Sequence, residues 1–136
     1  MTSYPMTPDD VRRLALAASE TIRTLNHATM PANGCPGLAY PSDAYTVVGA
    51  LAELAGRLPQ LLEQTSVFLQ RQLQFDLIDV DEGAYKGDPL GAIGTAANAL
   101  EGCAARSAQD LAGALMRAQQ AIAFASFNGE NASEKQ

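Results

Sequence analysis

The stretch DAYTVVGALAELAGRLPQLLEQTSVFLQRQLQF, residues 43–75, decides the fold that we predict for this chain. Its apolar residues return every three or four positions, which is the spacing of one face of an α-helix. That face carries Val47, Leu51, Leu54, Leu58, Leu61, Leu62, Thr65, Phe68 and Leu69. Pro59 would normally end or kink a helix, because it lacks an N–H and its ring collides with the preceding turn. Since the apolar face keeps its phase across Pro59, we predict one helix over 43–75, kinked near residues 55–59.

An amphipathic helix is also predicted before this stretch, over residues 8–28. Thr7-Pro8-Asp9-Asp10 has the order of a capping box with proline at the first helical position. The apolar stripe that follows consists of Val11, Leu14, Ala15, Ala18, Ile22 and Leu25. Residues 29–41 contain three prolines and two glycines and are predicted to form a loop, after which Ser42-Asp43 caps the next helix.

The last helical segment follows an acidic turn at residues 76–88, and Asp88-Pro89 repeats the order of cap and proline. Its apolar stripe recurs about every 3.6 residues, as in a straight helix. The stripe consists of Ile93, Ala97, Leu100, Ala104, Leu111, Leu115, Ala118 and Ile122. The segment Ser107-Ala-Gln-Asp110 resembles an internal capping box and leaves a split into two helices as an alternative. The continuous phase favours one helix that ends at Asn128-Gly129.

These segments predict an all-α protein, an antiparallel up-down bundle of three long helices, with four helices as the alternative if the last one splits near Ser107. Hydrophobic residues make up 47% of the 136 residues, aromatic residues only 6%, and tryptophan is absent. An alanine-rich composition favours helices that pack close together. We expect an N-terminal extension at residues 1–6, the helical domain at 7–127 and a flexible tail at 128–136.

The charge and the apolar runs exclude several classes of partner. The net charge is −6, and the nine Lys and Arg residues are scattered, so we expect no binding to nucleic acid. No run of 18 apolar residues exists and the N-terminus has no signal-peptide pattern, so we expect no membrane partner. The two cysteines are far apart in sequence, which predicts free thiols in a reducing cytoplasm.

The sequence offers no complete catalytic, metal-binding or cofactor-binding pattern. Asp79-x-Asp81-x-Gly83 imitates the first half of a calcium loop, but Ala84 stands at its sixth position and Leu90 at its twelfth. His27 is the only histidine, so neither a histidine metal cluster nor a Ser-His-Asp site centred elsewhere is available. We therefore predict that the protein is not an enzyme and holds no cofactor.

Three segments carry a resemblance to known proteins: Leu25-Asn-His-Ala-Thr29, Tyr40-Pro-Ser-Asp-Ala-Tyr45 and the run from Gly49 to Gln60. Together with the alanine-rich last helix, they make the chain similar to short, uncharacterised actinobacterial helical proteins, often encoded near plasmid-like or integrated transfer elements. The resemblance covers most of residues 7–127. It implies a cytoplasmic accessory protein and assigns no functional residue.

The function expected from this reading is non-enzymatic protein–protein interaction, with a homodimer that engages another protein. At about 1.5 Å per residue, helix 8–28 spans about 30 Å and helix 43–75 about 50 Å, so the first helix leaves part of the bundle uncovered. The apolar residues expected at that self-association surface are Leu69, Leu73, Phe75, Leu90 and Ile93. The alternative is a secreted helical effector resembling the small substrates of the type VII pathway, whose Trp-x-Gly turn this chain lacks.

Overall fold

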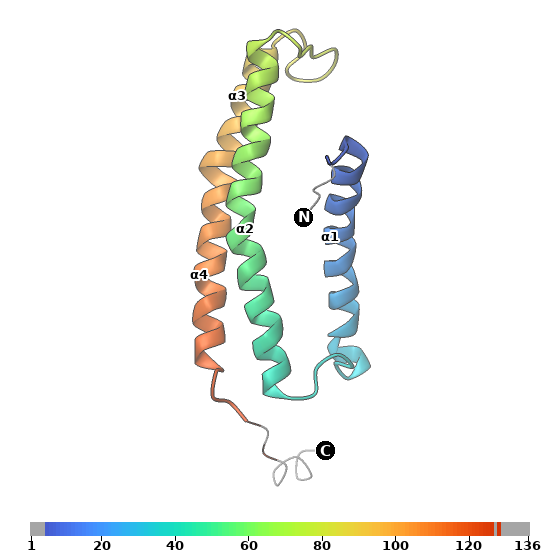
Figure 1. Cartoon of the computed structure of the whole chain (residues 1–136), viewed down its shortest axis with the longest axis vertical. Helices are drawn as coiled ribbons and strands as arrows, with labels where there is room; N and C mark the ends of the chain where they lie inside the picture. Colours follow the sequence, from blue (N-terminus) through green and yellow to red (C-terminus); the bar gives the residue numbers. More distant parts are fainter. Residues whose placement is uncertain (1–4, 127, 129–136) are drawn as a thin grey trace. The chain divides into compact units, whose positions relative to one another are not determined.

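The computed structural model describes residues 5–126 and residue 128, and their regular structure is entirely helical (Figure 1). The helices are α1 (Pro8–Ala28), α2 (Pro41–Gln74), α3 (Pro89–Ala97) and α4 (Ala105–Ala121), with a 3-10 turn at Pro31–Asn33 and a π-helical segment at Asn98–Ala104. No strand occurs among the described residues. The predicted all-α class is confirmed.

The chain divides into two compact units. α1 and the loop after it belong to the first unit, and residues 44–126 form the second. The bundle of three long helices stays a prediction, because it requires α1 to pack across the boundary of these units. The predicted domain limits also stay predictions, and the tail expected at 128–136 lies outside the described residues except for Asn128.

α1 begins with the predicted capping box. The Asp10 N–H donates to the Thr7 hydroxyl at 3.2 Å, and the Thr7 N–H donates to the Asp10 carboxylate at 3.0 Å. The backbone N–H of Thr7, then its hydroxyl and the Arg13 guanidinium, hold the pKa of Asp10 below its ordinary value. The helix ends at Ala28, where the pattern predicted it to end.

The start of α2 differs from the prediction by two residues. The helix begins at Pro41, and Asp43 lies in its first turn, where its carboxylate accepts from the N–H groups of Tyr40 and Ala39 at 2.8 and 2.9 Å. Both bonds favour the ionised carboxylate and lower the pKa of Asp43. Asp43 is thus the acid that reaches back to the chain before the helix, and Pro41 occupies the first position, where no N–H is needed.

α2 runs without interruption through Pro59 to Gln74. The prediction of one helix across the proline is confirmed, although the helix ends at Gln74 instead of Phe75. Pro59 is itself buried, so its ring contributes to packing while the chain on either side keeps its helical hydrogen bonds. The kink predicted near residues 55–59 stays a prediction.

The last helical segment is continuous from Pro89 to Ala121, and the predicted alternative of a break at Ser107 is wrong. The irregularity lies earlier, at Asn98–Ala104, where the Ala105 N–H donates to the carbonyl of Leu100, five residues back. Gly102 lies within this wider turn, and a Cβ there would lie 3.1 Å from the side-chain oxygen of Asn98. The segment ends at Ala121, earlier than the predicted Asn128-Gly129.

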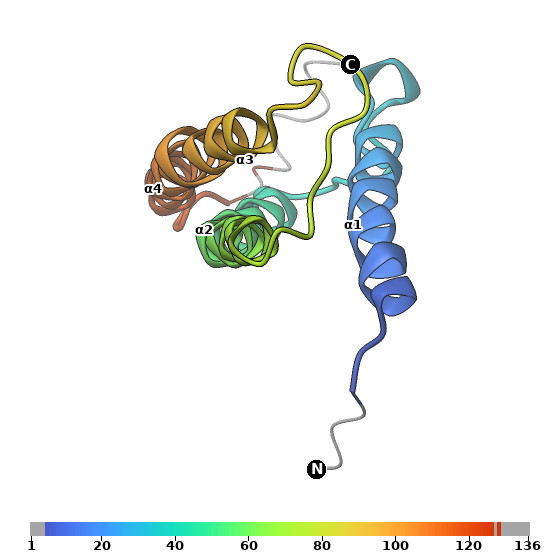
Figure 2. The same ribbon diagram turned by 90° about the horizontal axis from the view of Figure 1, so that it is seen from above.

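Within the second unit, α2 and the α3–α4 segment lie side by side and antiparallel (Figures 1 and 2). The loop between them folds on itself through a hydrogen bond from the Gly87 N–H to the Val80 carbonyl at 2.9 Å. Asp88 then caps α3 as predicted, accepting from the Gly91 N–H at 2.9 Å. The second unit is therefore a helical hairpin closed by a structured loop.

Candidate interaction surface

The interior of the hairpin is built from small side chains. The buried residues are Ala52, Ala55, Pro59 and Ser66 on α2, Ile93 on α3, and Ala105 and Ala108 on α4. Small side chains at the contact allow two helices to approach closely. Larger aliphatic side chains along the same contact, such as Leu62, Leu69 and Leu115, are half-buried.

The buried side chain of Ser66 is also hydrogen-bonded. The Ser66 side chain is fully buried, and its hydroxyl accepts from the Gln70 side-chain amide at 3.0 Å. The same amide reaches the Glu101 carboxylate across the hairpin at 3.5 Å. These bonds satisfy the buried hydroxyl and connect α2 to the π-helical segment.

The residues of α2 that face the interior are spaced alternately four and three positions apart, which is the repeat of a coiled-coil seam. We call them the inner seam: Val48, Ala52, Ala55, Pro59, Leu62, Ser66, Leu69 and Leu73, all of them buried or half-buried. The inner seam is displaced by about one residue, or about 100° around the helix, from the face predicted to be the core.

The predicted core face instead forms a second stripe with the same repeat. We call it the leucine stripe: Leu51, Leu54, Leu58, Leu61, Thr65 and Phe68. Leu51 and Leu58 are half-buried, whereas Leu54 is 40% exposed, and Leu61 and Phe68 are each 57% exposed. The prediction that this face packs in the core is wrong for Leu54, Leu61, Thr65 and Phe68, because close approach to α4 favours the neighbouring face of smaller side chains. The other residues predicted for the core face are half-buried: Val47, Leu51, Leu58, Leu62 and Leu69.

A similar displacement corrects the stripe predicted for the last helical segment. Ala105 and Ala108 are buried, while Leu111, predicted in the core, is 50% exposed. A π-helical turn holds more residues than an α-helical turn, so the inward face advances by about one residue after it. The stripe was predicted for an uninterrupted α-helix, so it does not include this shift.

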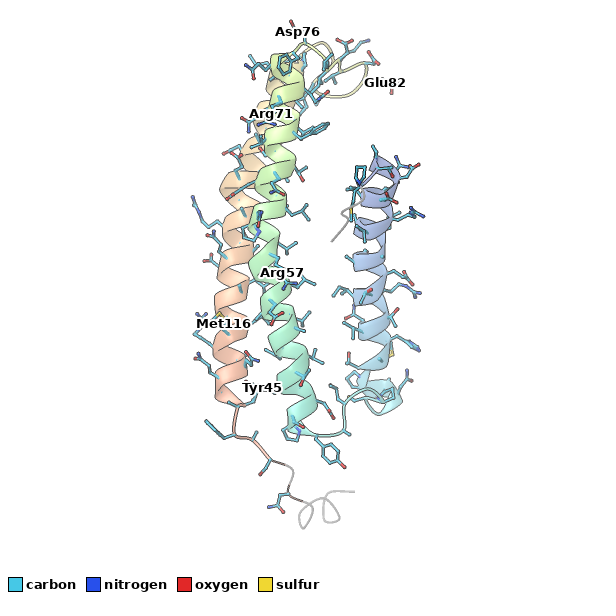
Figure 3. The ribbon with its side chains drawn as sticks, in the orientation of Figure 1. Tyr45, Arg57, Arg71, Asp76, Glu82 and Met116 are labelled. Carbon is cyan, nitrogen blue, oxygen red and sulfur yellow. The ribbon has the colours of Figure 1, made fainter. Side chains whose placement is uncertain are left out.

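Charged and amide side chains border the leucine stripe on the side away from α4. An open hollow of about 430 Å³ is lined by Ala50, Glu53, Leu54, Arg57, Leu58 and Leu61. A second, of about 520 Å³, is lined by Gln60, Glu63, Gln64, Val67, Phe68 and Arg71. Arg57 and Glu53 are 3.9 Å apart, and Arg71 makes no ion pair within the described part of the chain (Figure 3). The stripe thus has an apolar centre and a polar margin, as interfaces between proteins have.

The five residues predicted for self-association lie in different environments. Leu69 and Leu73 are half-buried members of the inner seam, and Ile93 is buried with 8% exposure. Phe75 and Leu90, at either end of the connecting loop, are 67% and 71% exposed. Only these last two are available to a partner, and their part in an interface stays a prediction.

The polar candidates do not come together as a site. Across residues 5–126 and 128, no group of three His, Cys, Asp or Glu side chains is arranged to hold a metal ion. Asp76 and Glu82 lie in the exposed loop between α2 and α3 (Figure 3), and His27 is exposed in the last turn of α1. Cys103, in the π-helical segment, is exposed.

A further hollow, of about 570 Å³, lies where the hairpin opens. It is lined by Tyr45, Thr46, Gly49, Ala50, Ala52, Glu53, Met116 and Gln119 (Figure 3). The side-chain amide of Gln119 lies against the backbone of α2 at Gly49, where a Cβ would oblige this flexible side chain to move.

No family model, curated protein or solved structure matches this chain. None of the helices in the described residues has the length and apolar character needed to cross a membrane.

Proposed function

We propose that this protein is a non-enzymatic interaction protein, an accessory component that acts by binding another polypeptide through the leucine stripe. The observation that carries the proposal is the exposure of large side chains on α2, with Leu54 40% and Leu61 and Phe68 57% exposed. They lie beside an interior made mainly of alanine. An apolar patch with a polar rim is the usual mark of a protein-binding surface.

The perturbed ionisable groups support a structural role for the charges. The Thr7 N–H lowers the pKa of Asp10, and the Tyr40 N–H lowers that of Asp43. The Arg23 guanidinium lowers the pKa of Glu20 in an exposed pair three residues apart. Each of these shifts belongs to a helix cap or a surface ion pair, whereas acid–base catalysis uses carboxyl groups held in a cleft.

Site-specific photo-crosslinking in the native cells tests the proposal. A photoreactive residue at Leu61 should yield a covalent adduct with another polypeptide, because the side chain is expected to lie in an interface. The matched control is Leu111, which is equally an exposed leucine but on α4 and away from the stripe. Adducts at Leu61 and not at Leu111 are expected. No adduct at Leu54, Leu61 or Phe68 would contradict the proposal.

We place this activity in the cytoplasm, on the basis of the two free cysteines. A second candidate is a secreted helical effector resembling small type VII substrates, which the helical hairpin of residues 44–126 favours and the absence of tryptophan disfavours. Immunodetection in washed cells and in culture medium separates the two. Protein confined to the lysate supports the accessory role, and accumulation in the medium without cell lysis supports the effector.

A further inference from the structure

We propose that the occupant of the leucine stripe is a second copy of this chain, with the two α2 helices antiparallel. The inference rests on the proposed function and names the partner of the same surface. Its starting point is the exposure of Leu54, Leu61 and Phe68 beside an interior whose buried side chains are small apart from Ile93. Apolar side chains left in contact with water favour association, and a second copy is present wherever the chain is made.

The leucine stripe is complementary to itself when it is turned end for end. With a two-fold axis near Gln60, Leu58 faces the partner's Leu61 and Leu51 faces the partner's Phe68. Leu54 then faces the partner's Thr65, whose hydroxyl already donates to its own Leu61 carbonyl at 2.8 Å. The methyl group of Thr65 is left for the apolar contact. Every layer of the antiparallel pair is therefore apolar.

The charges on the margin favour the same orientation. Arg57 and Arg71 lie on one edge of the stripe with Gln64 between them, and each arginine is seven residues from Gln64. In the antiparallel pair Arg57 meets the partner's Gln64. Arg71 meets the partner's Ala50, one helical turn from the partner's Glu53. In this arrangement Arg71, which makes no ion pair among the described residues, comes near a carboxylate of the partner.

Sedimentation of two matched variants tests the partner. The wild-type protein should sediment at twice the chain's 14.3 kDa at tens of micromolar. Leu61→Glu should weaken self-association at least 100-fold, because it places a carboxylate near the two-fold axis, whereas Leu111→Glu should leave the mass unchanged. A wild-type monomer at tens of micromolar, or Leu61→Glu that remains a dimer, would overturn the proposal.

The melting temperature of the wild-type protein provides a second measurement that needs no variant. A dimer that is required for stability melts at a higher temperature as protein concentration rises. A melting temperature independent of concentration over a 100-fold range would show that the stripe is covered within one chain. Photo-crosslinks at Leu61 to an unrelated protein, with no adduct between two copies, would also refute the inference and leave the proposed function standing.

Distances between spin labels test the orientation. Both native cysteines, Cys35 and Cys103, are replaced by serine. A label at Gln60 then lies near the two-fold axis, so the positions of the two labels along the helix direction differ by only about 2 Å. The two labels at Arg71 should lie about 35 Å apart along the helix direction, at about 1.5 Å per residue. Equal separations at the two positions would indicate a parallel pair and contradict the antiparallel arrangement.

Discussion

α2 carries two stripes with the same heptad spacing, yet the hairpin uses only one of them as its interior. The inner seam holds Ala52, Ala55 and Ser66 at its centre, whereas the leucine stripe holds Leu54, Leu58 and Leu61. Helices that meet over alanine and serine approach closely, and at one end the side-chain amide of Gln119 lies against the backbone of α2 at Gly49. Large side chains one position round the helix are thereby turned outward. In this chain, side-chain size and spacing together separate the intramolecular contact from the surface left for a partner.

The largest expected effect comes from a charge placed in the inner seam. Ala55→Asp should abolish the cooperative folding of the hairpin, because Ala55 is fully buried and a carboxylate there has no partner. The check is helical circular dichroism with thermal melting. Leu111→Asp, at a residue 50% exposed, should change stability by no more than about 0.5 kcal/mol. Equal effects of the two substitutions would show that the inward face of α4 is not the one described.

A smaller effect is expected from truncating one side chain of the leucine stripe. Leu61→Ala should destabilise the folded protein by about 2 kcal/mol if a partner chain covers Leu61, which is the loss found for buried leucines. Urea unfolding at tens of micromolar measures this. The control is Leu111→Ala, for which a change below about 0.5 kcal/mol is expected. A loss at Leu61 no larger than that of the control would indicate a stripe that stays in contact with water.

An effect of similar size is expected from overfilling the contact that α4 makes with the inner seam. Ala108→Leu adds a large side chain where α4 meets α2, and overpacking of this kind costs about 1–3 kcal/mol. Ala114→Leu, at an exposed alanine of the same helix, is the matched control. Chemical denaturation should show a clear loss of unfolding free energy for Ala108→Leu only. Equal stability of the two variants would indicate that α4 turns a different face towards α2.

The smallest expected effect is the loss of stability at low pH, where the carboxylates that cap the helices become protonated. The pKa of Asp10 and that of Asp43 are lowered in the folded protein, from an ordinary value of 3.8. Their contribution to stability is therefore complete above pH 3.8 and is lost as the pH falls through the lower folded values. Melting curves between pH 7 and pH 2 should show a gradual loss, reduced in the double variant Asp10→Asn/Asp43→Asn. A stability that rises on acidification would contradict this sign.

Features governed by neighbouring residues were predictable from the sequence. The capping box at Thr7, the proline start at Asp88 and the continuity of α2 through Pro59 all follow from local chemistry. The rotation of each helix about its own axis was not predictable. It depends on which faces the two helices press together, and on the extra residue of the π-helical segment at Asn98–Ala104. Three of the five residues chosen for self-association, which were expected to be left uncovered by the shorter first helix, belong to the inner face of the hairpin.

The central claim is that the leucine stripe is covered by a second copy of this chain, and the reactivity of a cysteine placed within it tests this claim most directly. In a protein with Cys35 and Cys103 replaced by serine, Leu61→Cys and Leu111→Cys place a thiol at positions of similar exposure, 57% and 50%. The rate of maleimide labelling is measured as protein concentration rises from nanomolar to tens of micromolar. We expect labelling at residue 61 to slow by at least tenfold while labelling at residue 111 stays constant. Equal and constant rates at both positions would contradict the account.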